Sequence, residues 1–187
     1  MFGGAVLALL LSGCVSGRIT DTSRTAVEQL LLSTAADRAV GLVDTSALEG
    51  KKVFVDVANL EATDKGYVVV AIRNELSTHG VDVVPDAKDA EVVVEAGSGA
   101  LANDRSDFLF GIPSFNIPMP GVGVLQNPEL AIFKKVSQRG RAKLLVYGRE
   151  AKGGKPVMSS GPHPGSSYYK RWQILFVSWR TTDIPQL

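Results

Sequence analysis

The chain has 187 residues, with 20 Lys and Arg, 19 Asp and Glu, two His and one Cys. A net charge of +1 with 21% charged residues excludes a disordered acidic tail and a strongly basic nucleic-acid binder. One cysteine and two histidines supply neither an internal disulfide nor a cysteine-rich zinc site, and the length fits a single domain.

The first fourteen residues have the pattern of a bacterial export signal. Residues 2–11 are uncharged and mostly apolar, with the length of a signal-peptide hydrophobic region and too few residues to span a membrane. The run ends in Leu11-Ser12-Gly13-Cys14, which resembles the lipobox of bacterial lipoproteins, where small residues seat the peptidase and the thiol accepts lipid. The resemblance implies a signal peptide over 1–13 and a lipidated tether over 14–21, anchored by acyl chains on Cys14.

The residue after the cysteine bears on the choice of membrane. Val15 stands where lipoproteins retained in the inner membrane tend to carry Asp, so the resemblance favours the outer membrane. We therefore expect residues 22–187 to form a domain that faces the periplasm. The alternative to a lipidated Cys14 is that this cysteine is buried in the core, behind an apolar N-terminal helix.

Two helices and a strand are predicted in the first half of the domain. Thr25-Ala26-Val27-Glu28 is a capping box, and apolar residues follow at helical spacing as far as Leu42, which predicts an amphipathic helix. Alternating β-branched residues predict a strand over 53–57. A second helix is predicted from Lys65 to about Thr78, with Asp64 as its cap and a glycine as its stop.

The second half reads as strands on either side of an apolar stretch. Four prolines and three glycines between Asn103 and Glu129 break any helix or central strand, so we predict a long apolar loop over 103–129. The glycine pair 153–154 signals a hairpin. Short strands are predicted over 81–85 and 91–96, and antiparallel strands over 131–133, 142–148, 156–160 and 174–181.

This order of elements predicts an α+β domain, with a mixed, largely antiparallel sheet and two helices packed on one face. The layout resembles the periplasmic domains of envelope lipoproteins, including the subunit fold of the curli-secretion lipoprotein. Several segments also look like a family of uncharacterised bacterial lipoproteins, which implies location and fold but no activity. They are 22–32, 50–56, 64–67, and 103–105 followed by 111–113.

Two local patterns are candidates for chemistry. Asp104, Arg105 and Asp107 place carboxylates beside a guanidinium, which suits acid–base work or cation binding. The alternative is a solvated loop in which Arg105 pairs with a neighbouring Asp. Residues 97–102 fit a dinucleotide-binding turn, but the prolines that follow leave no full crossover helix, so we expect a glycine-rich strand end.

Charge is distributed unevenly along the chain. Residues 1–100 contain 8 Lys and Arg against 14 Asp and Glu, whereas residues 101–187 contain 12 against 5. The basic residues gather with aromatic ones on adjacent predicted strands, a surface suited to an anionic lipid headgroup, a glycan or an acidic partner. The alternative is the solvent face of a half-buried sheet. The residues are Lys134, Lys135, Arg139, Arg141, Lys143, Arg149 and Tyr168–Trp172.

These observations favour a non-enzymatic, lipid-anchored envelope protein that acts through protein contacts in envelope assembly, transport or secretion. Its partners would be the membrane and an unidentified envelope protein; we expect no nucleic acid, cofactor or metal. The working surface would be the apolar stretch, which either docks to a partner or the bilayer or covers its own sheet. Its docking residues are Phe108, Phe110, Ile112, Phe115, Ile117 and Met119.

Two other functions stay open. The first is a periplasmic lipoprotein that binds a ligand or a glycan, or acts on one, through the Asp104 cluster or the basic and aromatic strands. The second is a homo-oligomeric pore subunit, which only the resemblance to the curli-secretion lipoprotein suggests.

Overall fold

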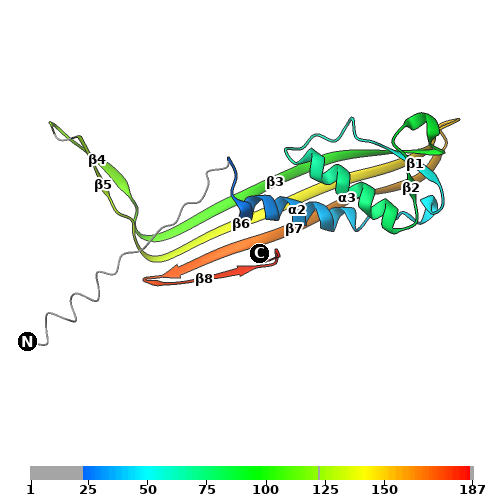
Figure 1. The fold of residues 1–187 in the computed structure, drawn as a ribbon. Coiled ribbons are helices and arrows are strands. Elements are labelled where there is room, and N and C mark those ends of the chain that lie inside the picture. The colour runs from blue at the N-terminus through cyan, green and yellow to red at the C-terminus, as the bar shows by residue number, and fades with distance from the viewer. Residues whose placement is uncertain (1–22, 122, 186–187) are drawn as a thin grey trace, which may run out of the picture.

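A computed structural model describes residues 23–121 and 123–185, so the predicted signal peptide, the tether over 14–21 and Cys14 lie outside the described residues. Two helices lie on one face of a mixed sheet, and a hairpin projects from the far end of that sheet (Figure 1). The helices are α2 (Ala26–Val40) and α3 (Lys65–Thr78), with short 3₁₀ turns η2 (Ser46–Leu48) and η3 (Ala87–Asp89). The strands are β1 (Lys52–Asp56), β2 (Asp82–Val83), β3 (Val92–Ile112), β4 (Phe115–Met119), β5 (Gly123–Asn127), β6 (Leu130–Glu150), β7 (Pro156–Ile174) and β8 (Val177–Thr182).

The main sheet has six strands in the order β2-β1-β3-β6-β7-β8. β1 runs parallel to both β2 and β3, and the remaining pairs are antiparallel. The predicted class, a mixed and largely antiparallel sheet with two helices on one face, is confirmed.

Helix α2 begins at the predicted capping box and lies directly on two glycines of the sheet. The Thr25 hydroxyl accepts a hydrogen bond from the Glu28 amide at 3.2 Å. A Cβ at Gly140 would collide with the backbone of Leu31, and one at Gly165 would collide with that of Ala35. The two glycines therefore let α2 approach the backbones of β6 and β7.

Helix α3 has the predicted bounds but a different start. Asp64 occupies the N-cap position without capping the helix; its carboxylate instead accepts a hydrogen bond from Arg24 Nη1 at 2.9 Å. Tyr67 donates a hydrogen bond to Asp37 Oδ1 at 2.8 Å, and burial, together with this bond, raises the pKa of Tyr67 to about 12. These two contacts join α3 to α2 and to the residues just before it.

The hydrophobic core occupies only the half of the sheet that the helices cover. Val68, Ile72 and Leu76 of α3 pack in the same cluster as the small residues of α2. The strands contribute side chains that point toward the helices, at alternate positions as the strand repeat requires. These are Val53 and Val55 of β1, Val92, Val94 and Ala96 of β3, and Ala142, Leu144 and Val146 of β6.

The predicted loop over 103–129 is wrong, because most of it is strand. β3 continues to Ile112, paired with β6 from Asn103↔Gly140 to Ile112↔Leu130. Three of the four prolines lie in the turns that flank β4 and β5. The fourth, Pro118, lies within β4, and a two-stranded hairpin leaves alternate N–H groups unpaired, so a proline is tolerated there.

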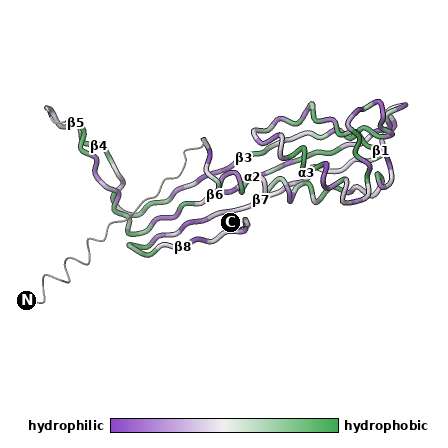
Figure 2. Tube along the Cα trace, viewed as in Figure 1, coloured by the Kyte–Doolittle hydropathy of each residue, from purple (hydrophilic) through white to green (hydrophobic). Residues whose placement is uncertain are grey.

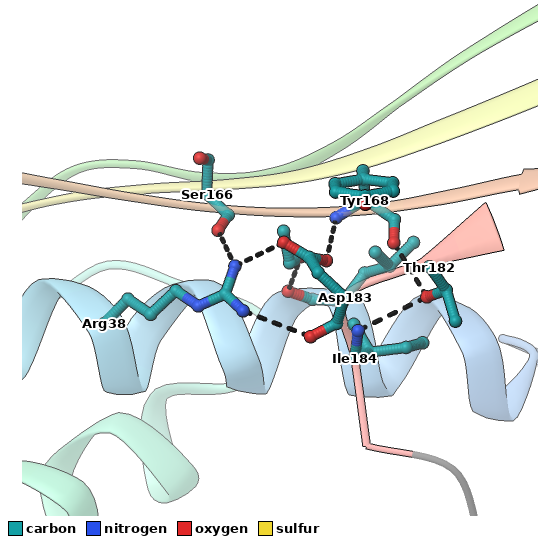
Figure 3. Close-up of polar contacts among 8 residues, drawn as sticks. Arg38, Ser166, Tyr168, Thr182, Asp183 and Ile184 are labelled. Atoms are coloured by element: carbon teal, nitrogen blue, oxygen red, sulfur yellow. Dashed lines mark hydrogen bonds and ion pairs between the residues drawn. The ribbon is translucent and has the colours of Figure 1, made fainter.

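The end of β8 is fastened to α2 by a polar cluster (Figure 3). Arg38 Nη1 lies 2.6 Å from Asp183 Oδ2 and also donates to the Ser166 carbonyl at 2.5 Å. The second oxygen of Asp183 accepts the Tyr168 amide at 2.6 Å, and the Thr182 hydroxyl donates to the Tyr168 carbonyl at 2.8 Å. This edge of the sheet therefore closes against the helix.

Candidate functional site

Beyond the helices, the sheet ends in a group of exposed apolar side chains, called here the apolar end. They come from the tips of β3, β6, β7 and β8, from the turn between β7 and β8, and from the projecting hairpin (Figure 2). Phe176, in the turn, is 99% exposed and Phe110 is 60% exposed. The members are Phe110, Ile112, Phe115, Ile117, Val124, Leu125, Leu130, Ile132, Ile174, Leu175, Phe176 and Val177.

The apolar end is almost free of charge. Residues 108–128 contain no Asp, Glu, Lys or Arg, and neither do residues 172–179. Asp107, Glu129, Arg171 and Arg180 stand directly outside these two stretches. Asp107, Arg171 and Arg180 therefore mark the base of the apolar end, whereas Glu129 stands between the hairpin and the first residue of β6 and is paired with Lys134.

A row of four aromatic side chains crosses the sheet at this base, on the face that the helices do not cover, which we call the open face. The ring centroids of Phe108 and Phe133 are 5.8 Å apart, and those of Phe133 and Trp172 are 6.2 Å apart. Trp172 and Trp179 stack at 6.4 Å. Lys135 places its Nζ 4.5 Å from the Trp172 ring, so a cation lies directly on this aromatic row.

The predicted polar cluster does not converge, because its members point to opposite faces of β3. Arg105 and Asp107, two residues apart, share the helix side, where Arg105 Nη2 lies 2.8 Å from Asp107 Oδ2. Asp104 lies on the open face and accepts from Arg141 Nε at 2.7 Å. The hydrogen bond from Arg105 lowers the pKa of Asp107 and raises that of Arg105. The alternative pairing of Arg105 with a neighbouring Asp is therefore the one that forms, on a strand rather than in a loop.

A hollow of about 320 Å³ lies on the helix side, between the start of α2 and the uncovered strands. Thr25 and Val27 line it from the helix, and Arg105, Lys134 and Arg171 line it from the sheet. Lys134 is paired with Glu129 at 2.6 Å. The hollow marks where the chain enters α2, beside the base of the apolar end.

The basic residues of the predicted strands are divided between the two faces. Lys134 and Arg171 lie on the helix side, whereas Lys135, Arg139, Arg141 and Lys143 follow one another along the open face of β6. Lys170 joins this second group from β7, with its Nζ 5.0 Å from the Tyr168 ring. We call Lys135, Arg139, Arg141, Lys143 and Lys170 the basic stripe.

The basic stripe is only partly neutralised. Arg141 is held by Asp104. Within the described residues, Arg139 and Lys143 have no carboxylate at ion-pair distance. Arg149, further along β6, is bound by Glu95 at 2.8 Å, and this hydrogen bond raises the pKa of Arg149. The open face therefore keeps cations available to a ligand.

The remaining polar groups make local contacts. Ser160 Oγ lies 2.6 Å from His163 Nε2 and also accepts the Asp44 amide at 3.3 Å. His163 belongs to β7. In the part of the chain that the structure describes, no three His, Cys, Asp or Glu residues gather as metal ligands. No helix within residues 23–121 and 123–185 is long and apolar enough to cross a membrane.

Five of the six predicted docking residues are exposed, so they do not cover the sheet. Phe108 lies in the aromatic row, and Phe110, Ile112, Phe115 and Ile117 lie in the apolar end. The sixth, Met119, is the last residue of β4. Sequence reasoning missed the turn at Leu175–Phe176, although the eight uncharged residues 172–179 between two arginines were a signal for it.

Comparison with known proteins places the chain in a family. Residues 8–176 match the model of a family of unknown function, DUF6655. The chain belongs to this family. The matched range begins before Cys14 and ends at Phe176, so it includes the long strands and most of the apolar end. No curated protein matches the chain.

Proposed function

We propose that this protein is a non-enzymatic lipoprotein of the bacterial outer membrane that faces the periplasm and works by docking through its apolar end. The anchor would be lipid on Cys14, as the lipobox resemblance implies. Contact through the apolar end would hold the helix-covered half of the sheet, which contains the hydrophobic core, at a fixed place next to the partner. The residues that would make the contact lie at the ends of strands and in their turns, and not in the loop that the sequence predicts.

The exposure of the apolar end carries this proposal. Fully burying one large apolar side chain contributes about 1.5–3 kcal/mol, so a dozen exposed ones leave a large free energy for association. A soluble monomer rarely exposes a contiguous apolar patch larger than a few hundred Å². These side chains come from six strands and one turn; the ends of β3, β6, β7 and β8 are neighbours in one sheet, and the hairpin continues from β3 and β6, so the members gather at one end of the molecule.

The pairing of the polar groups supports contact over catalysis. Arg105 and Asp107 satisfy each other on one face, while Asp104 and Arg141 do so on the other. A general acid or base has to reach a substrate from a shared site. Here the candidate carboxylates instead neutralise adjacent cations.

The test replaces Phe110 and Phe115 with Ser in the full-length chain, expressed in cells with a photo-crosslinking residue at Ile117. We expect the double variant to lose its cross-links, while V70S, at an exposed position on α3, keeps them. Unchanged cross-links in the double variant would remove the apolar end from the function. Globomycin treatment tests the anchor separately, since it should accumulate the uncleaved form of the wild type.

A second candidate function is the binding of an anionic glycan along the basic stripe. Arg139 and Lys143 have no carboxylate at ion-pair distance in the described ranges: Lys143 lies opposite Ala100 on β3, and Arg139 lies opposite Asp104, whose carboxylate is bound by Arg141. The small neighbour leaves Lys143 accessible, and the Tyr168 ring, opposite Arg139 on β7, offers a sugar a stacking surface. We expect R139Q/K143Q to reduce sedimentation with peptidoglycan, and K152Q/K155Q, in the β6–β7 turn, to leave it unchanged.

A further inference from the structure

We propose that the partner of the apolar end is the interfacial layer of an anionic lipid bilayer, with Trp172 and Trp179 at the depth of the headgroups. This inference rests on the proposed docking function and names its partner. It is argued from the two faces of the hairpin, the aromatic row, the neighbouring cations and the position of the tether.

The hairpin β4–β5 exposes apolar side chains on both faces. Leu125 is paired with Ile117 and shares its face, whereas Val124 is paired with Pro118 on the opposite face. Val124 is 67% exposed and Leu125 is 56% exposed. A protein partner ordinarily covers one face of a hairpin, but a fluid apolar layer surrounds both. The face of Val124 also carries the uncharged amides Asn116 and Gln126, so the hairpin fits the interfacial layer of a bilayer, where apolar and polar groups meet.

The aromatic row fits the boundary of such a layer. Indole rings are enriched where hydrocarbon meets water, because an apolar ring and a polar N–H are each satisfied there. Along the paired strands, Trp172↔Trp179 is followed by Gln173↔Ser178 and then by Ile174↔Val177, which belongs to the apolar end. The two tryptophans thus stand one step above the residues that would enter the bilayer.

Cations lie at the same level and just above it. Lys135 shares its row with Trp172, and Lys170 and Arg171 precede that tryptophan directly. A basic side chain near an anionic membrane surface is attracted to the lipid headgroups. By contrast, the charges of α3 and of the β6–β7 turn lie at the other end of the sheet. The sequence of apolar residues, tryptophans and cations thus follows the layers of a bilayer surface.

The start of α2 lies near the base of the apolar end. Thr25 and Arg171 line the same hollow. Arg171 precedes Ile174 by three residues on β7, which places the two about 10 Å apart along the strand. The nine residues from Cys14 to Thr22 span up to about 31 Å when extended. Acyl chains on Cys14 and the apolar end can therefore enter one bilayer together.

The experiment measures the depth of the tryptophans in the lipid-anchored protein. Trp172 and Trp179 are the two tryptophans of the whole chain, so their fluorescence reports on this surface alone. The purified lipoprotein is reconstituted in phosphatidylethanolamine and phosphatidylglycerol vesicles that carry lipids brominated either near the carbonyl or near the chain terminus. We expect strong quenching, greater with the shallow bromine, and less quenching when phosphatidylglycerol is omitted.

Matched variants separate this proposal from the docking function. L175S/F176S should lose at least half of the quenching while still floating with the vesicles, and L42S/V70S, also at exposed apolar positions, should lose none. Wild-type fluorescence that bromine does not quench overturns the bilayer as partner, even where F110S/F115S still abolishes cross-links to a protein. Intact mass of the same preparation shows whether Cys14 carries lipid, so failure of the anchor is seen independently.

Discussion

Arg38 and Asp183 form an ion pair across 145 residues of chain, with Nη1 2.6 Å from Oδ2. The guanidinium belongs to the last turn of α2, and the carboxylate follows the last strand of the sheet. Burial raises the pKa of Asp183. The hydrogen bonds from the Tyr168 amide and from Arg38 lower it by more than burial raises it, so the pKa lies below its ordinary value. The charged carboxylate is therefore the form that the fold stabilises.

D183N should lower the free energy of unfolding by about 1 kcal/mol at neutral pH, because it keeps the shape and removes a partly exposed charge pair. An unfolded Asp has a pKa of about 3.9, so this contribution is complete above that pH and is lost as the pH falls through the lower folded value. Urea unfolding at pH values from neutral to acidic checks both points. D86N, which breaks an exposed pair with Lys88, is the control; an equal loss at every pH contradicts the charge argument.

Because α2 packs closely against β6 and β7, Gly140 and Gly165 should not tolerate an added methyl group. G140A and G165A each place a Cβ against the backbone of α2, so each should destabilise the protein by about 3 kcal/mol through overpacking. G97A is the matched control, because its Cβ would lie 3.7 Å from the Asn59 carbonyl oxygen, an ordinary contact. Thermal unfolding followed by circular dichroism compares the three. Similar stability of G140A and G97A would mean that α2 does not lie this close to β6.

Tyr67 should ionise at a higher pH than an ordinary tyrosine. Its pKa of about 12 exceeds the ordinary value of about 10. The folded state therefore holds the phenol proton more tightly, and this contribution to stability disappears as the pH rises between the two values. Ultraviolet titration should show a late-ionising phase in the wild type that Y67F removes. D37N should lower the late pKa without restoring the ordinary value, since burial remains.

Exposure predicts opposite outcomes for two apolar substitutions. F176S should change the free energy of unfolding by less than about 0.5 kcal/mol, because the ring is 99% exposed. L144A, at a position that is 1% exposed, should cost about 3 kcal/mol by leaving a cavity in the core. Urea midpoints at equal slope measure both. A large loss in F176S would indicate that the turn at Phe176 packs against its own chain.

Local signals were sufficient for the helices and for the class of fold. The capping box at Thr25 and the apolar spacing of Val68, Ile72 and Leu76 depend on neighbours in sequence, and both helices form as predicted. Asp64 was a misleading signal, because a carboxylate at an N-cap position is drawn away when Arg24 lies beside it.

The long strands depend on pairing between distant residues. Asn103 to Ile112 has no strong strand pattern of its own, but β6 offers a continuous partner that satisfies its backbone. The split of Asp104 from Arg105 and Asp107 follows from the same change, since a strand alternates its side chains and a loop does not. The tip formed by Leu175 and Phe176 required knowing that β7 and β8 end beside the hairpin.

The length of β3 and β6 fixes how far the helix-covered body stands from the apolar end. From Val94 in the core to Ile112 at the tip, eighteen residues at about 3.3 Å give a reach of about 60 Å. The two strands are paired along this length, with irregularities near Gly99 and Ile132, so the sheet sets the distance between the helix-covered half and the apolar end. Insertions or deletions in the paired strands would change this distance in steps of two residues, about 7 Å. A single-residue insertion or deletion would turn the side chains of the aromatic row to the opposite face of the sheet.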